Sequence, residues 1–256
     1  MLGSMGKTLS VAMIALNEAE NLPRTLASVA WANEVVVVDS GSTDGTQEIA
    51  RRAGARVIEE PWKGFAGQKN SAIGHATGDW VLSLDADEEV GPELAAEIRG
   101  LLAGEPEFGA YRVRRLNHFM GRALRHGGYW PDPKLRLFRR GAAWFPERAV
   151  HESMAAEGAV GELKGHLVHR CYPTLEEYIE HMNRYSSVAA AGLAAKGRTS
   201  GSLGAFLWNA VANPAATFAY NYFFRLGFMD GREGLVQHLN HSVYVHWKYV
   251  KAGERQ

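Results

Sequence analysis

The chain has 256 residues, of which 46% are hydrophobic, and it contains a single cysteine. This length accommodates one large domain or one domain with an extension, and the hydrophobic content is typical of a globular protein with a packed core. A single cysteine excludes an internal disulfide, and the N-terminus shows no secretory signal. We therefore expect a protein of the cytoplasm.

The formal net charge is zero, but the charges are unevenly distributed along the chain. Residues 1–110 contain 8 basic and 17 acidic residues (−9), whereas residues 111–256 contain 20 basic and 11 acidic residues (+9). Such a split indicates two different functional surfaces. The acidic half is suited to a metal ion and the basic half to an anionic partner. Nucleic acid is the least favoured partner, because the arginines are dispersed and no recognised binding motif accompanies them.

Strand and helix patterns alternate in the first half of the chain. Strands are predicted over residues 9–15, 34–38, 56–59 and 80–84. Three helices are predicted between them: one with Asn21 as its N-cap, a second that ends near Arg52, and a third over residues 67–76. This order predicts a parallel, doubly wound sheet whose ligand site lies at the carboxyl ends of its strands. The first strand is followed by no glycine-rich fingerprint, and no Walker-type loop is present, which argues against dinucleotide and P-loop enzymes.

Polar side chains follow three of the predicted strands, as Asn17 with Glu18, residues 39–44, and residues 85–89. The last group places four acidic residues within five positions. Such like charges repel one another unless a cation lies between them, and a divalent cation commonly brings a phosphate with it. Acidic residues also favour helix starts, and we expect this simpler role for Glu89, which precedes the helix predicted near Pro92.

Four motifs in chain order resemble those of a family 2 glycosyltransferase with the GT-A fold. They are Met-Ile-Ala-Leu-Asn-Glu (13–18), Val-Val-Val-Asp-Ser-Gly-Ser-Thr-Asp-Gly-Thr (36–46), Lys-Asn (69–70) and Asp-Trp-Val-Leu-Ser-Leu-Asp-Ala-Asp-Glu (79–88). Residues 128–140 and the Val-His-Glu at 150–152 are similar to the lipopolysaccharide-core β-1,4-glucosyltransferase branch, whose members add a sugar to an inner-core heptose. The resemblance covers most of residues 8–250 and is weakest from 155 to 200.

This resemblance implies a GT-A type, mostly parallel α/β sheet with a helical C-terminal extension, divided into a catalytic core (6–155) and an acceptor-side extension (156–252). It also implies an inverting, metal-dependent transfer of a hexose, glucose from UDP-glucose, to a lipopolysaccharide-core or other lipid-linked acceptor. Asp39 would contact the nucleoside of the donor, and Asn17 and Glu18 would line the same pocket.

The metal, Mg²⁺ or Mn²⁺, would be held by Asp87 together with Asp85 and would neutralise the departing diphosphate. Lys69 adds a positive charge near the diphosphate or is a solvated helix residue. Arg136 is suited to clamp a phosphate. Because strand residues alternate between faces, Arg136 and Arg139 should point to opposite sides of the sheet.

An inverting transfer also needs a general base to deprotonate the acceptor hydroxyl. Glu152 is the first choice, because His151 and Glu152 occupy the place where many family members carry Glu-Asp. Asp132 is the second choice and Glu147 the third. His151 is either a third metal ligand or an orienting partner of the base.

The C-terminal part predicts helices, the first over residues 174–196 with Thr174 as N-cap and Glu177 completing a capping box. Residues 199–224 contain no charged residue, but three asparagines and Pro214 argue against a membrane-spanning helix. Three alternatives remain, an interfacial helix at the inner membrane, a re-entrant helix, and a helix buried against the sheet.

Two other functions compete with glycosyl transfer. A metal-dependent nucleotidyltransferase also places paired carboxylates at a strand end, but it needs a basic, glycine-rich loop near the first strand that this chain lacks. A nucleotide-sugar or glycan-binding protein without turnover would not need Asp85, Asp87 and Glu152, all of which are present.

Overall fold

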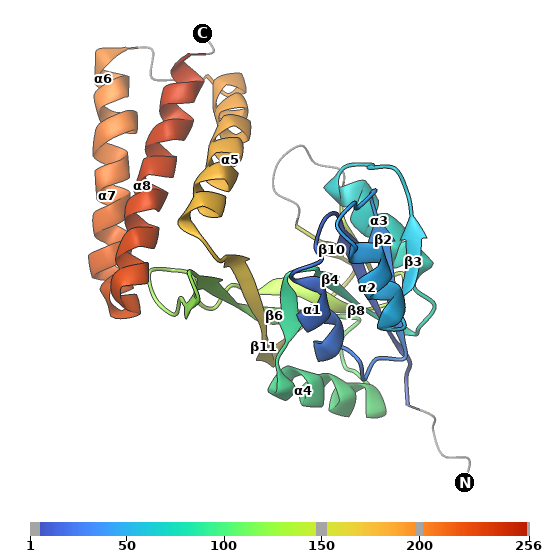
Figure 1. The fold of residues 1–256 in the computed structure, drawn as a ribbon. Helices are drawn as coiled ribbons and strands as arrows, with labels where there is room; N and C mark the ends of the chain where they lie inside the picture. The colour runs from blue at the N-terminus through green and yellow to red at the C-terminus, as the bar shows by residue number, and fades with distance from the viewer. Residues whose placement is uncertain (1–5, 147–152, 198–201, 255–256) are drawn as a thin grey trace. The chain divides into compact units, whose positions relative to one another are not determined.

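The structure, a computed structural model, describes residues 6–146, 153–197 and 202–254 (Figure 1). It divides into two compact units, of which the first contains residues 1–115 and 132–169 and the second contains residues 116–131 and 170–256. The first part of the chain alternates strands and helices, as predicted: β1 (Leu9–Ala15), α1 (Leu22–Ser28), β2 (Glu34–Asp39), α2 (Thr46–Arg52), β3 (Arg56–Glu59), α3 (Phe65–His75) and β4 (Trp80–Asp85).

The sheet continues with strands that the sequence analysis only partly anticipated. They are β5 (Glu88–Val90), β6 (Ala110–Phe119), β7 (Arg122–Ala123), β8 (Lys134–Arg139) and β11 (Val160–Tyr172), with α4 (Pro92–Ala103) after β5. The strand order is β3-β2-β1-β4-β8-β6-β11-β5, with β7 beside β6. Strands β3, β2, β1 and β4 are parallel, whereas β8 runs antiparallel to β4 and to β6. A two-stranded sheet of β9 (Ala143–Trp144) and β10 (Ala155–Ala156) completes the strands.

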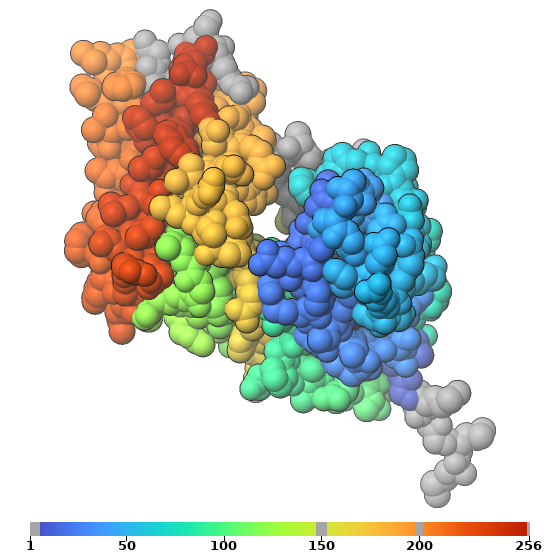
Figure 2. Space-filling view, in the orientation of Figure 1, coloured from blue at the N-terminus to red at the C-terminus, as the bar shows by residue number. Residues whose placement is uncertain are grey.

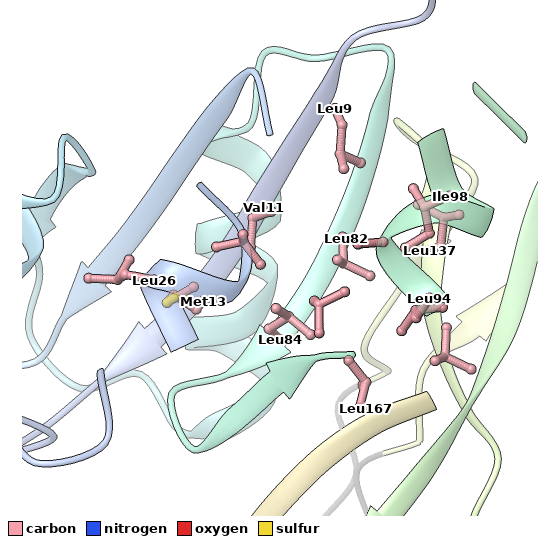
Figure 3. Packing of buried hydrophobic residues seen from close by; sticks show 14 of the residues in the cluster. Leu9, Val11, Met13, Leu26, Leu82, Leu84, Leu94, Ile98, Leu137 and Leu167 are labelled. Atoms are coloured by element: carbon pink, nitrogen blue, oxygen red, sulfur yellow. The ribbon is translucent and has the colours of Figure 1, made fainter. Parts of the chain in front are cut away.

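Helices cover both faces of the sheet in the first unit, which confirms the predicted α/β layers. Val11, Met13, Leu82 and Leu84 pack under α1 and α4, against residues such as Leu26, Leu94 and Ile98 (Figure 3). Their strand neighbours Ala12 and Val81 point the other way and pack under α3. The alternation along β1 and β4 therefore builds two apolar layers, as expected for strands buried on both faces.

The start of α1 differs from the prediction in one detail. Asn21 occupies the N-cap position, but its side chain caps no backbone amide. Instead, its Nδ2 donates to the Glu18 carboxylate at 3.0 Å. The side chain is thus used by the polar loop after β1 rather than by the helix.

The second unit is mainly helical. It contains α5 (Leu175–Ala195), α6 (Leu203–Phe206), η1 (Leu207–Ala212), α7 (Asn213–Ala219), η2 (Tyr220–Phe224), η3 (Gly227–Asp230) and α8 (Gly231–Gly253). The predicted cap of α5 is confirmed, since the Thr174 side chain accepts a bond from the Glu177 amide. Helix α8 packs against both α5 and α7. Across the described ranges, no helix is long and apolar enough to cross a membrane.

One close approach fixes α4 on the sheet. Gly165 of β11 lies so near the helix that an added Cβ would be 2.5 Å from the Leu94 Cα atom. The Gly165 amide also donates to the Glu97 carboxylate at 2.8 Å. Only a residue without a side chain fits between the strand and the helix backbone.

We expect Gly165→Ala to lower the free energy of unfolding by about 1–3 kcal/mol, because the added methyl group must push α4 away from the strand. Gly100→Ala is the matched control, since Gly100 lies within the same helix with open space at its Cβ position. That change should raise the free energy of unfolding by about 0.4–1 kcal/mol. Urea unfolding curves measure both, and equal effects of the two changes would contradict the close approach.

Candidate active site

The polar residues predicted at three strand ends lie together at the carboxyl edge of the parallel strands. The backbone of Asn17, after β1, has a left-handed conformation with φ 56°. Its amide donates to the Ser42 hydroxyl at 2.8 Å, and its side-chain oxygen accepts a bond from the Thr43 amide at 2.9 Å. Asn17 thereby joins the loop after β1 to the loop after β2.

Asp39 ends β2 and is fully buried. Its Oδ1 accepts bonds from the amides of Gly41 and Ser42, both at 2.9 Å, and from Gln47 Nε2 at 2.7 Å, while the Ser42 hydroxyl donates to Oδ2. Burial works to raise the pKa of Asp39, but the bonds from Ser42 and Gln47 outweigh it, so the pKa is lowered. Asp39 is therefore an ionised carboxylate that organises the loop after β2.

The acidic run after β4 forms a turn and a strand rather than the start of a helix. Asp85 is the last residue of β4, and Glu88 and Glu89 belong to β5, which pairs with β11. The predicted helix-start role of Glu89 is wrong, because α4 begins at Pro92 after an N-cap at Gly91. Glu89 instead lies 3.5 Å from the Arg24 guanidinium. A pairing partner far along the chain thus decided the structure of this segment.

Two cations hold Asp85. Lys69 Nζ, from α3, lies 2.7 Å from one carboxylate oxygen, and Arg136, from β8, lies 2.7 Å from the other. Arg136 also binds Glu88 Oε1 at 2.6 Å, and both Arg136 and Glu88 are buried. Burial opposes ionisation, but the Arg136 and Lys69 charges keep the pKa of Asp85 well below its usual range.

The arginines of β8 divide between the two faces as predicted. Arg136 reaches Asp85, whereas the Arg139 guanidinium lies over the Trp80 ring at 6.0 Å from its centre. Lys69 is no solvated helix residue, because its side chain is largely buried and paired with Asp85. Its ammonium group also lies 5.3 Å from the centre of the Phe145 ring.

The chain of alternating charges extends from Glu88 to Asp132. Arg115 of β6 binds Glu88 at 3.2 Å and Asp132 at 2.7 Å, and Lys134 binds the other Asp132 oxygen at 2.9 Å. Burial works to raise the pKa of Asp132, but Arg115 and Lys134 lower it overall. A general base works best with a pKa near the operating pH, so these cations make Asp132 a poor base.

Asp87 is the acid of this cluster that the cations leave uncompensated. In the described parts of the chain no arginine or lysine lies within ion-pair distance of it, and its carboxylate contacts His169 Nε2 at 3.1 Å. The pKa of nearby Glu18 responds to the same concentration of negative charge. The pKa of Glu18 is raised, first by burial and then by the charges of Asp87, Asp44 and Asp85, against the bond from Asn21.

His169 is the site residue that the sequence analysis missed. It lies in β11, opposite Glu88 of β5 in the strand register. Alternation along residues 160–172 was a signal for this strand, but nothing local indicates that its partner is the three-residue β5. His151 and Glu152, the predicted metal ligand and base, lie outside the described residues.

The arrangement can bind an anionic ligand with a divalent cation. Lys69 and Arg136 supply positive charge beside Asp85, and Asp87 with His169 supplies one oxygen and one nitrogen donor. Among the residues that the structure covers, no group of three or more histidine, cysteine or acidic side chains is arranged to hold a metal alone. Phosphate oxygens of a bound ligand commonly complete the coordination of Mg²⁺ at such a site.

Comparisons with known proteins point to one family. The family model described as "Glycosyl transferase family 2" matches residues 10–151. The lipopolysaccharide core biosynthesis glycosyltransferase LpsC of Rhizobium meliloti is 31% identical over 259 residues, which cover 96% of this chain and 92% of LpsC. An uncharacterized glycosyltransferase of Rickettsia typhi is 32% identical over 204 residues, or 75% of this chain and 70% of that protein.

A solved structure shares the fold. A mannosyltransferase from Pyrobaculum calidifontis, in complex with GDP-Man and Mn²⁺, matches with a TM-score of 0.57 and 20% identity, covering 98% of this chain and 88% of its own. The likeness at this identity concerns the fold, and it confirms the predicted GT-A type sheet with a helical C-terminal part.

We expect Arg136→Met to lower the free energy of unfolding by about 3–5 kcal/mol, because it leaves Asp85 and Glu88 without their shared buried counter-charge. Arg139→Met is the matched control on the same strand, where the residue is exposed and its guanidinium lies over the Trp80 ring, with no ion pair to a described residue. The control should cost less than about 1 kcal/mol. Urea unfolding would show the difference, and a small loss for Arg136→Met would mean that the cluster does not depend on it.

Proposed function

Because the chain belongs to glycosyl transferase family 2, we propose that it transfers a hexose, with inversion, from UDP-glucose to a lipopolysaccharide-core acceptor or another lipid-linked glycan. The observation that carries the proposal is the acidic turn at the end of β4, in which two cations compensate Asp85 while Asp87 faces His169. The similarity to LpsC over nearly the whole chain supports the acceptor class. UDP-glucose as the donor follows from the resemblance of the sequence motifs to the glucosyltransferase branch.

The donor would bind at the carboxyl ends of β1, β2 and β4. Asn17, Glu18 and the loop held by Asp39 would line the nucleoside pocket, and Lys69 and Arg136 would place positive charge beside the diphosphate. We further propose that residues 6–155 form the donor-binding core and residues 156–252 serve the acceptor side. Work on a lipid-linked acceptor would bring the protein to the cytoplasmic face of the inner membrane as a peripheral protein.

The described residues fit a divalent cation, Mg²⁺ or Mn²⁺. The Asp87 carboxylate is not compensated by lysine or arginine within the described ranges, and carboxylate oxygens suit Mg²⁺ and Mn²⁺. Asp87 and His169 would hold the ion, with His151 proposed as a further ligand, and Asp85 would support them from its ion pairs. When bound, the ion would neutralise the charge that develops on the leaving diphosphate.

The acceptor hydroxyl needs a base on the other side of the anomeric carbon. We assign this role to Glu152, because Asp132 is ion-paired through both oxygens and its pKa is lowered. Deprotonation by Glu152 would let the hydroxyl oxygen attack the anomeric carbon as the bond to the diphosphate breaks. Asp132 would then serve to hold Arg115 and, through it, Glu88.

A thermal-shift experiment tests donor and metal together, since a ligand that binds only the folded state raises the unfolding temperature. UDP-glucose should raise it in the presence of Mn²⁺ or Mg²⁺ and much less in their absence. Asp87→Asn should remove the metal-dependent part. Asp79→Asn is the matched control, because Asp79 bonds Thr8 at the opposite end of β4 and should keep the shift. No shift with any nucleotide-sugar would refute the proposal.

The base is tested by Glu152→Gln, which keeps the size of the side chain and removes its basicity. Transfer of labelled glucose to a heptose-terminated lipopolysaccharide core should fall by about 10²–10⁴-fold, while the UDP-glucose thermal shift survives. Asp132→Asn should slow transfer less and should lower stability, since Arg115 and Lys134 lose the negative charge that they share. If Glu152→Gln transfers glucose at a near-normal rate, the base is another residue.

A further inference from the structure

The helical segment 203–224, formed by α6, η1, α7 and η2, exposes an apolar face. This apolar face consists of exposed large side chains, namely Leu203, Phe206, Leu207, Trp208, Val211, Tyr220, Phe223 and Phe224. Small alanines fill the exposed positions between Val211 and Tyr220. Trp208 is 67% exposed and Phe224 is 79% exposed. No charged side chain interrupts this face, because the segment contains none.

The polar residues of the same segment lie on its inner side. Asn209, Asn213, Thr217 and Asn221 are spaced four residues apart and are only partly exposed. This spacing places them on one face of a helix. Next to them, Ala210 and Pro214 are buried, and the Ala210 carbonyl oxygen lies 2.6 Å from His246 Nδ1 of α8. The polar stripe therefore faces α8, and the apolar face points away from it.

This arrangement is the reverse of an ordinary surface helix, whose apolar stripe faces the core and whose polar side faces water. In Figures 1 and 2 the segment runs along the side of α8 that is turned away from α5. The segment has 22 residues from Leu203 to Phe224. The apolar face therefore runs over several consecutive helical turns as a long strip. Contiguous exposed apolar surface of this kind marks a site of interaction.

The composition of the strip favours lipid over protein as its partner. Protein–protein interfaces carry roughly one hydrogen bond per 100–200 Å² and have a polar rim. On the apolar face, only the Trp208 and Tyr220 side chains have a polar atom. Aromatic residues gather at one end, where Tyr220, Phe223 and Phe224 adjoin exposed Phe228. Aromatic side chains beside basic ones are typical of the boundary between acyl chains and headgroups.

Basic residues flank the strip. Arg225 directly follows the aromatic end and is exposed. Arg232 lies seven residues further on, with an 81% exposed side chain that pairs with Glu233 at 3.2 Å. Lys196 is exposed at the end of α5, before the segment begins. Such cations attract anionic lipid headgroups, each by about 1 kcal/mol near a membrane surface.

We propose that the apolar face of residues 203–224 lies in the surface of an anionic phospholipid bilayer, with Trp208 and Phe224 among the acyl chains and Arg225 and Arg232 at the headgroups. The helix lies in the plane of the membrane and does not cross it. The membrane binding rests on the proposed function only in its biological role, which is to hold the enzyme where a lipid-linked acceptor is found. The binding itself is a property of this surface and can be measured without donor or acceptor.

Sedimentation with vesicles tests the surface. The full chain should sediment with vesicles of phosphatidylcholine mixed with phosphatidylglycerol, and less with phosphatidylcholine alone. The double variant Trp208→Gln/Phe224→Gln should bind at least about tenfold more weakly, because each large apolar side chain contributes roughly this factor when buried. Val188→Gln is the matched control, an equally apolar and half-exposed position on α5, and it should bind like the unchanged protein.

Several outcomes would overturn the proposal. The unchanged protein could remain in the supernatant with both kinds of vesicle, or the double variant could sediment as well as the unchanged protein. A dimer that the double variant converts to a monomer, measured by light scattering, would make this face an interface between copies. Equal binding to both vesicle types would remove the role of Arg225 and Arg232.

The thermal shift with UDP-glucose, measured without vesicles, separates this proposal from the proposed function. The double variant should keep that shift, because its two changes lie outside the donor-site residues. Binding to vesicles without a thermal shift by any nucleotide-sugar would support the membrane surface and contradict the proposed reaction. A thermal shift by UDP-glucose without binding to vesicles would support the reaction and contradict the membrane surface.

Discussion

The buried guanidinium of Arg136 is the interaction on which the acidic end of β4 depends. Asp85 and Glu88 share it, and Glu88 is fully buried. Removing such charges from water costs several kcal/mol per ion unless a counter-charge and further bonds accompany them. Arg136 reaches both acids because β8 lies antiparallel beside β4, with Leu137 opposite Leu82. The antiparallel strand is thus what permits the acidic turn.

The cations that gather around the end of β4 divide the acidic residues into two kinds, those that are neutralised by lysine or arginine and those that are not. Asp85, Glu88 and Asp132 are neutralised within the protein by Lys69, Arg136, Arg115 and Lys134. Asp87, two residues after Asp85, faces only a histidine in the described parts of the chain. Acids that lie close together in the sequence therefore have different environments. Asp87, which pairs with no lysine or arginine among the described residues, is the one suited to an external cation.

Local patterns predicted the strands and the polar loops but not the distant pairings. The valine run of β2 and the apolar run of β4 predict buried strands from their composition alone. In a parallel sheet the carboxyl ends of such strands lie at one edge, so the polar residues after them were expected to lie together. Glu89 and His169 could not be assigned in this way, because β5 and β11 pair across about eighty residues and neither strand signals its partner. The asparagines at 209, 213 and 221 were visible as interruptions, but their inward direction depends on where α8 packs.

The burial of Asp39 has a consequence for ligand recognition. Its carboxylate is fully enclosed and already accepts bonds from Gly41, Ser42 and Gln47. A nucleoside hydroxyl that bonds to Asp39 must therefore exchange with an internal donor and not fill a vacant position. Exchange of this kind adds little to affinity, since one hydrogen bond replaces another. If Asp39 contacts the donor, selectivity would depend on how well the ligand hydroxyl replaces the Ser42 hydroxyl, and binding would require the loop after β2 to rearrange.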